Sequence, residues 1–372
     1  MSSTSSSAFQ FSTPAIEVER AVSELRYGRP VILKEGSRHL AAVSLDCIAP
    51  SLYDQFAAAT YDSHSLLLTA PRAGRLGLGH AIGHGRDVLA PLAGISFDRA
   101  SRLAYALGAD QPQSYQPADG LASLSAELAR IALLLPAMVV ADVTYSADRF
   151  SGCCSLEASQ LRGADVARQR FDKIARTRVP LAGLGQAEFV VFRGGLAQKD
   201  QVAIIVGQPD LTKTVPVRVH SSCMTGDLCG SLKCDCGDQL RNGLSLLKHA
   251  GGGVLLYLDQ EGRGTGIGAK MRAYGYQHLG LDTIDADAEL GLGEDHRRYE
   301  AAIAMLQLLE IKRVAVYTNN PTKIAALRAG GISVEARAPV NGLVTAENEN
   351  YLRTKTLRAG HMMDLETLVA AE

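Results

Sequence analysis

Four of the chain's seven cysteines lie within fourteen positions, in the stretch CMTGDLCGSLKCDC at residues 223–236. Cys223, Cys234 and Cys236 have the spacing C-x10-C-x-C, and two cysteines separated by one residue suit a shared metal ion better than a strained disulfide. Three thiolates favour zinc and leave its fourth tetrahedral position open for water, as in hydrolytic sites. If Cys229 completed the shell the zinc would be structural, and a third reading is that the cysteines are ordinary buried thiols.

A glycine-rich turn follows the cysteines, in LDQEGRGTGIGAKMRAY at residues 258–274. Glycines let backbone N–H groups approach a phosphate, although turns also collect glycine for steric reasons alone. Arg263, Lys270 and Arg272 add the fixed cations that a polyphosphate needs. Glu261 could accept hydrogen bonds from the ring N–H and the exocyclic amine of guanine, or it could form a salt bridge with a nearby arginine.

Two further polar segments could serve the same site. GEDHRRYEAAIAML places Asp295 and Arg297 at the expected start of a helix, with Tyr299 close behind. An acid in that place is usually explained by the helix dipole. In TNNPTK, residues 318–323, Asn-Asn-Pro marks a turn, and Lys323 could bind a phosphate or face water.

These motifs follow apolar runs that predict the strands of an α/β sheet. VPVRVH leads into the cysteines, GGGVLLYLDQ into the glycine turn and KRVAVYTNN into the last motif, while AAIAMLQLLE has helical spacing. EFVVFR and QVAIIVG predict two strands nearer the start of this region. Ligand groups at the carboxyl ends of strands meet at the binding edge of an open sheet, so the motifs should lie together.

The preceding part of the chain predicts a second α/β unit. A helix is expected where apolar residues recur at helical spacing, with Gly28 as its C-terminal cap, and a strand follows at 31–33. Short apolar runs then alternate with helical patterns to about residue 141, and a polar segment marks the junction. The predicted fold class is α/β, in two domains that are each a mixed sheet flanked by helices. The expected divisions are a flexible tail at 1–14, a first domain at 15–144, a linker at 145–178 and a second domain at 179–372.

Composition agrees with two ordinary globular domains. The 372 residues exceed the size at which one hydrophobic core keeps growing, with 47% hydrophobic and 21% charged residues. A formal net charge of −1 argues against a nucleic-acid partner and against a membrane-surface protein. The start of the chain has no secretory pattern, and no apolar run is long enough to span a membrane, so a cytoplasmic location is expected. Disulfides are rare in that compartment, which favours metal binding by the clustered cysteines.

The C-terminal half, about 179–365, resembles GTP cyclohydrolase II. VRVHSSCMTGDLCGSLKCDCGDQL, DQEGR, RAYGYQ, EDHRRY and TNNPTK occur in the order seen in that family. The family opens the imidazole ring of GTP and releases formate and pyrophosphate. Its product is 2,5-diamino-6-ribosylamino-pyrimidinone 5'-phosphate, at the head of riboflavin biosynthesis.

The resemblance implies a site and its cofactors. One Zn2+ per chain would lie on Cys223, Cys234 and Cys236, which leaves Cys229 outside the ligand set, and Mg2+ would accompany the triphosphate. Asp295 would be the general base, and Tyr274 would move a proton near the purine. Arg297 would attack the α-phosphate or, because a guanidinium stays protonated, stabilise the departing pyrophosphate. A homodimer is also implied. The implied GTP contacts are Arg218, Val219, His220, Ser221, Ser222, Gln239, Glu261, Gly262, Arg263, Thr283, Thr318 and Lys323.

The first domain has a looser resemblance, to dihydroxybutanone phosphate synthase. GISFDRASRLAYAL, residues 94–107, is similar to a segment of that enzyme, which is often fused ahead of the cyclohydrolase. The synthase holds magnesium on an acidic loop, whereas the corresponding LKEGSRHLAAVS offers only Glu35. The resemblance therefore implies a degenerate synthase-like domain that persists as a scaffold, a dimer surface or a regulator.

Two departures from the family pattern keep an alternative function open. Ser222 stands where the family commonly has glutamate, and Ala269 stands where it has an asparagine. A catalytically impaired or product-altered paralogue that binds GTP and regulates is therefore the alternative to an active enzyme. A structural zinc module that binds nucleic acid is the least favoured reading, since no basic stripe accompanies the cysteines.

Overall fold

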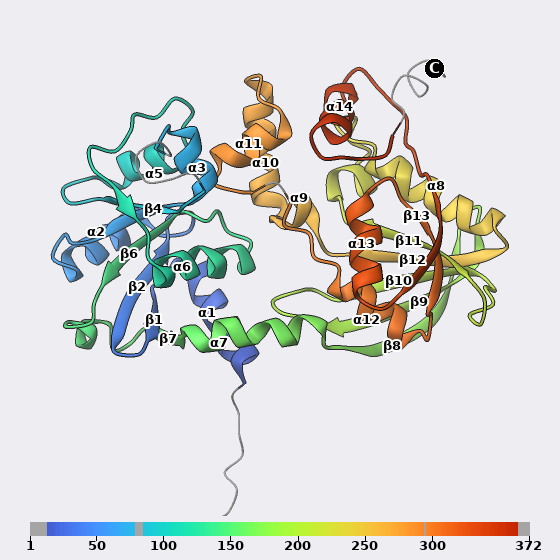
Figure 1. Cartoon of the computed structure of the whole chain (residues 1–372), viewed down its shortest axis with the longest axis horizontal. Helices are drawn as coiled ribbons and strands as arrows, with labels where there is room; N and C mark the ends of the chain where they lie inside the picture. The colour runs from blue at the N-terminus through green and yellow to red at the C-terminus, as the bar shows by residue number, and fades with distance from the viewer. Residues whose placement is uncertain (1–12, 79–84, 294, 364–372) are drawn as a thin grey trace, which may run out of the picture.

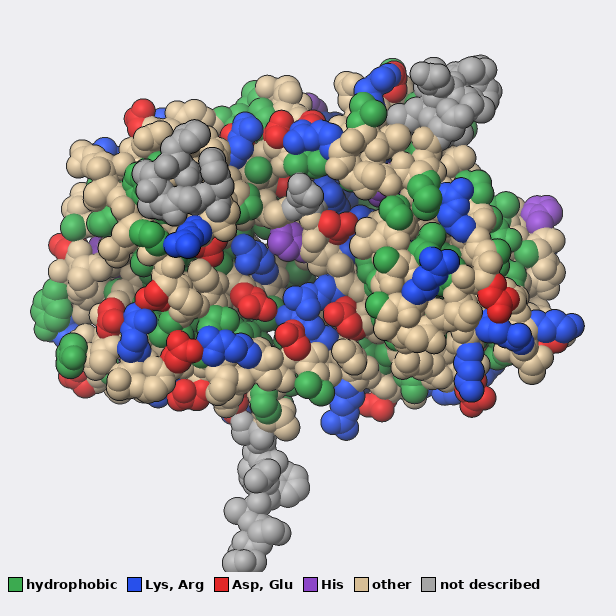
Figure 2. Space-filling model, viewed as in Figure 1, with side chains coloured by type: hydrophobic (Ala, Val, Ile, Leu, Met, Phe, Trp, Pro, Cys, Tyr) green, Lys and Arg blue, Asp and Glu red, His purple; other side chains and the backbone are tan. Residues whose placement is uncertain are grey.

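The computed structural model describes residues 13–78, 85–293 and 295–363 of the chain. Two seven-stranded sheets, each flanked by helices, form the two halves of the molecule in Figure 1. This architecture confirms the predicted fold class. On the face shown in Figure 2, charged side chains of both signs gather along the boundary between the halves.

The first sheet has the strand order β5-β4-β3-β6-β2-β1-β7, and its pairings are antiparallel except for the parallel pair β1 and β7. Its strands are β1 (Val31–Glu35), β2 (Arg38–Ser44), β3 (Ser65–Leu68), β4 (Val88–Pro91), β5 (Gln116–Pro117), β6 (Met138–Asp142) and β7 (Cys154–Glu157). Its helices are α1 (Pro14–Arg26), α2 (Pro50–Ala59), α3 (Ala70–Arg75), α5 (Phe97–Tyr105), α6 (Gly120–Ile131) and α7 (Ala158–Gly163), with 3-10 turns at Ala147–Phe150 and Ala164–Gln169.

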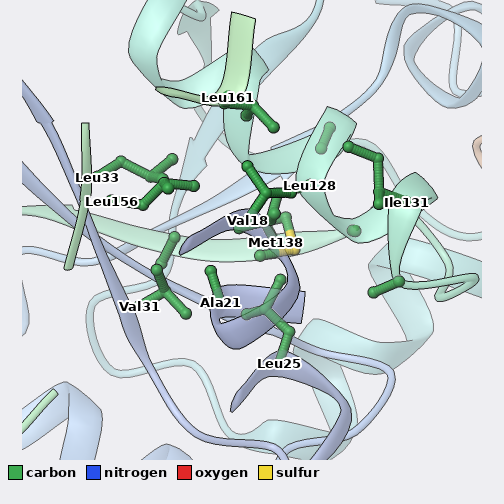
Figure 3. Packing of buried hydrophobic residues seen from close by; sticks show 14 of the residues in the cluster. Val18, Ala21, Leu25, Val31, Leu33, Leu128, Ile131, Met138, Leu156 and Leu161 are labelled. Atoms are coloured by element: carbon green, nitrogen blue, oxygen red, sulfur yellow. The ribbon is translucent and has the colours of Figure 1, made fainter. Parts of the chain in front are cut away.

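A hydrophobic core covers each face of this sheet. Figure 3 shows the first, where Val18, Ala21 and Leu25 of α1 pack with Leu33 of β1 and Leu128 of α6. The second core, on the other face, includes residues of α2 and α5. Side chains of a strand alternate between faces, so the continuous apolar run of β1 is explained by burial on both sides.

The helix expected near the start of the chain is α1. Thr13 caps it by accepting a hydrogen bond from the backbone N–H of Ile16, and Pro14 occupies its first turn. Gly28 follows the helix with φ +69°, a conformation that glycine adopts without strain. Of the predicted tail, residues 1–12 lie outside the described residues, and Pro14 belongs to the helix.

The second sheet has the order β14-β13-β11-β12-β10-β9-β8. The strands from β14 to β12 are parallel, and those from β12 to β8 are antiparallel. Its strands are β8 (Phe171–Leu181), β9 (Gly185–Gly194), β10 (Gln201–Gly207), β11 (Val215–Ser221), β12 (Gly252–Leu258), β13 (Arg313–Tyr317) and β14 (Ser333–Ala338). Its helices are a π-helical turn at Met224–Leu228, α8 (Cys236–His249), α9 (Glu261–Gly264), α10 (Gly266–His278), α11 (Thr283–Glu289), α12 (Glu300–Leu308), α13 (Pro321–Ala329) and α14 (Glu349–Leu357).

The segment 145–178, predicted to be a linker, contains regular structure. β7 pairs with β1 and completes the first sheet, while β8 pairs with β9 and begins the second sheet at Phe171. The polarity that suggested a linker has a physical reason, because β8 is an edge strand whose side chains are mostly exposed. In the described part of the chain, we find no helix with the length and apolar character needed to cross a membrane.

Candidate active site

A cavity opens at the carboxyl ends of the parallel strands β11 and β12, beside the end of β13. β11 delivers residues 218–223 to it, β12 delivers residues 260–263, and the segment after β13 delivers residues 318–323. The cavity encloses about 990 Å3 when the open solvent at its mouth is counted. The predicted meeting of the three motifs at one sheet edge is therefore observed.

Three cysteine sulfurs meet at the cavity wall. The ligand atoms of Cys223, Cys234 and Cys236 lie within 4.8 Å of one another, and the sulfurs of Cys223 and Cys234 are 3.6 Å apart. Two sulfurs bound to one tetrahedral zinc ion would be about 3.8 Å apart, so the spacing fits zinc. Cys229 is exposed and lies outside this group, which agrees with three ligands and not with four.

Gly226 leaves room for the sulfurs. A Cβ atom at Gly226 would lie 2.9 Å from the sulfur of Cys234 and 3.1 Å from that of Cys223. Hydrogen bonds with the Cys234 and Cys236 thiols lower the pKa of Cys223, and the Lys270 ammonium acts in the same direction. The donor set and the space around it therefore fit a thiolate-bound metal ion.

Lys270 and Glu261 support the cysteine loop from the neighbouring helices. Lys270 Nζ lies 3.1 Å from Cys223 Sγ and 2.8 Å from Glu261 Oε1. Glu261 Oε2 accepts a hydrogen bond from the backbone N–H of Met224 at 2.6 Å. Burial acts to lower the pKa of Lys270, but the bond to Glu261 and the charge of Cys223 outweigh it and raise that pKa. The salt bridge expected for Glu261 is thus made with a lysine and not with an arginine.

Asp227 organises the other side of the cysteine loop. Its carboxylate accepts hydrogen bonds from the Cys223 backbone N–H at 2.9 Å and from the Tyr257 hydroxyl at 2.9 Å. His220 Nε2 lies 3.1 Å from the same carboxylate, and its ring stacks on Tyr257. Burial lowers the pKa of His220, which favours the neutral imidazole. Sequence analysis missed Asp227, although its position inside the cysteine loop was a signal.

Buried cations form a second wall of the cavity. Arg218 bonds to the Tyr317 carbonyl at 3.0 Å and to Gln239 at 2.8 Å, while Lys323 Nζ donates to the Val219 carbonyl at 2.8 Å. Burial lowers the pKa of Arg218 to about 10 and lowers that of Lys323 well below its usual range, with nearby positive charges adding to the second effect. Lys323 is 6% exposed, so the reading that it faces water is wrong.

Residues near the end of the described chain also belong to this second wall of the cavity. Tyr351 and Lys355 of α14 line the cavity, as does His361. Lys355 Nζ donates to Asp235 at 2.9 Å, and Asp235 is fully buried. No sequence motif pointed to these residues, because more than a hundred positions separate them from the cysteines.

Arg297 and Asp295 form a bidentate ion pair. Arg297 Nε lies 2.9 Å from Asp295 Oδ1, and Nη2 lies 2.6 Å from Oδ2. Burial acts to raise the pKa of Asp295, but Arg297 outweighs it and the pKa is lowered. α12 begins only at Glu300, so the helix-dipole reading of Asp295 has no support in the structure. Arg297 lines the cavity, whereas Asp295, the predicted general base, contacts Arg297 and is not among the residues that line it.

Asp287, a carboxylate that was not predicted, lines the cavity. Arg263 Nη1 lies 3.4 Å from Asp287 Oδ2. Burial raises the pKa of Asp287 to about 7, against the opposing effect of Arg263 and with the help of Asp295. Asp287 shares the face of α11 that carries Thr283 toward the cavity.

Of the remaining predicted residues, some line the cavity and others do not. Val219 is a core residue of β11 that offers only its carbonyl, and Ala269 is buried among apolar side chains at the boundary with the first domain. Ser222 lines the cavity and its hydroxyl accepts a hydrogen bond from the Gln260 N–H at 3.1 Å. The Tyr274 ring lies under Lys233 and Lys270. The predicted residues that line the cavity are Arg218, His220, Ser221, Ser222, Cys223, Cys234, Cys236, Gln239, Glu261, Gly262, Arg263, Tyr274, Thr283, Arg297, Thr318 and Lys323.

Comparison with known proteins adds family evidence. Residues 172–339 match the family GTP cyclohydrolase II, a span that begins in β8. The chain is 52% identical to the GTP cyclohydrolase-2 of Xylella fastidiosa strain 9a5c over 362 residues, which cover 96% of this chain and 90% of the relative. The GTP cyclohydrolase-2 of Azospirillum brasilense is 36% identical, with 93% of each chain covered.

Other relatives match only part of the chain. A GTP cyclohydrolase-2 of Acinetobacter baumannii strain SDF is 45% identical over 190 residues, which cover 51% of this chain and 94% of the relative. Among solved structures, RibBX of A. baumannii, a two domain 3,4-dihydroxy-2-butanone 4-phosphate synthase, has a TM-score of 0.31 and 17% identity over 87% of this chain and 98% of that one.

Proposed function

The chain belongs to the GTP cyclohydrolase II family and is an enzyme of that family, and from this premise we propose a zinc-dependent reaction with defined products. The enzyme hydrolyses GTP to 2,5-diamino-6-ribosylamino-pyrimidinone 5'-phosphate, formate and pyrophosphate. The observation that carries this proposal is that three clustered thiols and several buried cations line one cavity. That arrangement suits a substrate that brings both a reactive ring and a polyphosphate to the same site.

Cys223, Cys234 and Cys236 would hold the zinc ion. When bound, zinc supplies Lewis-acid activation of water for attack on the purine ring. The loop that carries the three cysteines is fixed from both sides, by Asp227 on one side and by Lys270 with Glu261 on the other. This support keeps the thiols converged, as a metal site requires.

The cation wall would bind the triphosphate. Arg218, Lys355 and Arg297 supply positive charge from three different segments, and burial strengthens their attraction to phosphate oxygens. Lys323, whose pKa is lowered by burial, adds an amine that can donate hydrogen bonds. Mg2+ would enter with the triphosphate as part of the nucleotide complex. Glu261 Oε1 accepts hydrogen bonds from Lys270 and from the Gly262 N–H, and Oε2 accepts one from Met224, so a guanine contact would use the remaining lone pair of Oε2.

The proton-transfer roles follow from charge. Asp295 stays ionised because Arg297 lowers its pKa, so it can accept a proton as the general base. Arg297 stays protonated, so it is suited to stabilise charge on the departing pyrophosphate and not to attack the phosphate. Burial raises the pKa of Tyr274, whose hydroxyl therefore keeps its proton near the purine.

A homodimer and a cytoplasmic location complete the proposal. Both come from the family resemblance and from the sequence pattern, and sedimentation of the purified protein would measure the first. The impaired paralogue gains no support from Ala269, which is buried at the domain boundary and does not line the cavity.

Turnover of GTP tests the proposed function. The zinc-loaded protein is incubated with GTP and magnesium while formate, pyrophosphate and the product mass are followed together. Cys234→Ser removes a metal ligand, and Cys229→Ser is the matched control because Cys229 is exposed outside the cluster. We expect all three products from the wild type and from Cys229→Ser, and loss of zinc and of formate from Cys234→Ser.

Two outcomes would contradict parts of this proposal. GTP binding without formate would leave a binding or regulatory paralogue. Release of pyrophosphate without formate, or a product mass that retains the ring carbon, would indicate altered chemistry on the same substrate.

A further inference from the structure

α10 and α11 lie between the two halves of the molecule and form one wall of the cavity (Figure 1). Lys270 and Tyr274 of α10, together with Thr283 and Asp287 of α11, line the cavity. Other faces of the same two helices contact the first domain. The placement of four cavity side chains therefore depends on how these helices are held.

Apolar packing joins the helices to the first domain. Leu135, which follows α6, belongs to one buried cluster with Ala269 and Ala273 of α10, with Ala286 of α11 and with Leu290 directly after α11. The small alanines allow the helices to approach closely. The Tyr276 hydroxyl of α10 also donates a hydrogen bond to the Tyr105 carbonyl of the first domain.

A buried ion pair crosses the same boundary. Arg72 of α3 is 1% exposed and pairs with Glu289 of α11, which is 6% exposed. Arg75 Nε donates to the other oxygen of Glu289 at 2.7 Å. Arg72 also donates to the carbonyls of Leu103 and Ala106, so its guanidinium is fixed within the first domain.

Two outer contacts flank this pair. The Thr69 hydroxyl donates to the Gly291 carbonyl at 2.6 Å, directly after α11. Arg272 of α10 pairs with Asp46, whose second oxygen accepts a hydrogen bond from the Leu135 N–H at 3.1 Å. The first domain thus contacts α10 and α11 through side chains that alternate with those lining the cavity.

Charges are costly to bury, so a buried pair gains little net stability but permits few alternative arrangements. We propose that the first domain positions α10 and α11, and that Arg72 and Glu289 are positioning residues for the reaction in the second domain. The activity readouts rest on the proposed function. Glu289 lies two residues after Asp287, so a shift of α11 would move the Asp287 carboxylate and the Thr283 hydroxyl within the cavity.

Some relatives are much shorter than this chain. The A. baumannii relatives align over 190 residues, which are 51% of this chain and 94% of their own length, so they are too short to match both domains. In the present chain, the boundary is built around Glu289 and an apolar cluster that the first domain covers.

Single and double substitutions in the full chain test the inference. Glu289→Gln leaves the buried charge of Arg72 unpaired, and Arg72→Gln leaves Glu289 paired with Arg75, whereas the double variant removes both buried charges and leaves two amides that can bond to each other. Glu188→Gln is the matched control, because Glu188 forms an exposed pair with Arg176 in the β8–β9 hairpin. The measurements are kcat, KM for GTP, the Kd of a non-hydrolysable GTP analogue and the midpoint of thermal unfolding.

We expect Glu289→Gln to lower kcat/KM about tenfold or more and to weaken analogue binding, since small displacements of positioning groups have effects of this size. The double variant should recover part of both losses, and Glu188→Gln should match the wild type. A lower unfolding midpoint with unchanged kcat, KM and Kd would overturn the inference, because it would show a purely structural pair. If the wild type released no formate, the proposed function would fail, and the analogue Kd values would decide the positioning role alone.

Discussion

Asp287 is a carboxyl group whose charge the fold disfavours. Arg263 is nearby at 3.4 Å, but burial and the charges of Asp295 and Asp282 raise the pKa of Asp287 from 3.8 to about 7. A carboxyl group with this pKa binds its proton more tightly in the folded state than in the unfolded state. Its contribution to stability is therefore complete below pH 3.8 and is lost as the pH rises through about 7.

Asp287→Asn removes this pH dependence. The difference between the ordinary pKa of 3.8 and the pKa of about 7 in the folded state corresponds to at most about 4 kcal/mol of unfolding free energy. We expect the variant to resemble the wild type near pH 4 and to unfold at a higher temperature near pH 8. Thermal unfolding at several pH values measures the difference, with the exposed Asp172→Asn as the control. Parallel curves for Asp287→Asn and the wild type would show that Asp287 is charged at neutral pH.

At the level of single residues, the sequence was informative where chemistry depends on local spacing. The C-x10-C-x-C pattern pointed to the three sulfurs that the structure brings within 4.8 Å. Asp287 and Lys355 were missed because their environment arises from tertiary contacts. Nothing in the residues next to Asp287 in the sequence reveals that its carboxyl group will be buried beside Asp295.

At the level of elements, α14 adds a wall to the cavity. Lys355 points inward to the buried Asp235, and Arg353, two residues earlier, points outward to Glu349 at 2.6 Å. One helix thus carries one cation into the site and another into solvent. The two positions form a matched pair for experiment.

Lys355→Gln should impair both binding and stability. The change removes positive charge from the cavity, so we expect KM for GTP to rise about tenfold, which corresponds to about 1.4 kcal/mol. It also leaves the carboxylate of Asp235 buried without its cation, which should lower the unfolding free energy by about 3 kcal/mol. Steady-state kinetics and urea unfolding measure the two effects. Arg353→Gln should leave both quantities unchanged, and an equal rise of KM in that variant would point to a general effect of charge.

Prediction of strands from the sequence succeeded where the strands are apolar and failed for the exposed strand β8. The runs that became β11 and β12 are buried along most of their length, and their continuous hydrophobicity identified them, whereas β13 alternates between buried and partly exposed positions. β8 is an edge strand with mainly exposed side chains, so its composition resembles that of a linker. Its pairing with β9 depends on backbone hydrogen bonds, which leave no mark on hydrophobicity.

At the level of the whole molecule, chain length and alternating patterns sufficed for two α/β domains. They gave no indication that side chains of one domain would pack into a buried cluster with side chains of the other. Leu135 belongs to the first domain by sequence, yet its buried neighbours include Ala286, Leu290 and Leu292 of the second. Contacts of this kind join residues more than a hundred positions apart, and single-sequence patterns carry no signal for them.

A shared cluster between the domains should make unfolding cooperative. We expect the wild type to unfold in one calorimetric transition, because exposing the boundary also uncovers the buried Glu289. Leu135→Ala removes the fully buried side chain that the first domain contributes to the cluster and should cost about 2–5 kcal/mol, mostly at the boundary. The single transition should then separate into two.

Leu128→Ala is the matched control for this prediction. Leu128 is equally buried but packs inside the first domain, against α1. Its loss should lower the transition temperature by a similar amount and keep one transition, with equal calorimetric and van't Hoff enthalpies. One unbroken transition in Leu135→Ala would show that the polar contacts across the boundary, which include the ion pair at Glu289, suffice to couple the domains. Two transitions in the wild type would show that the domains unfold independently despite their shared boundary.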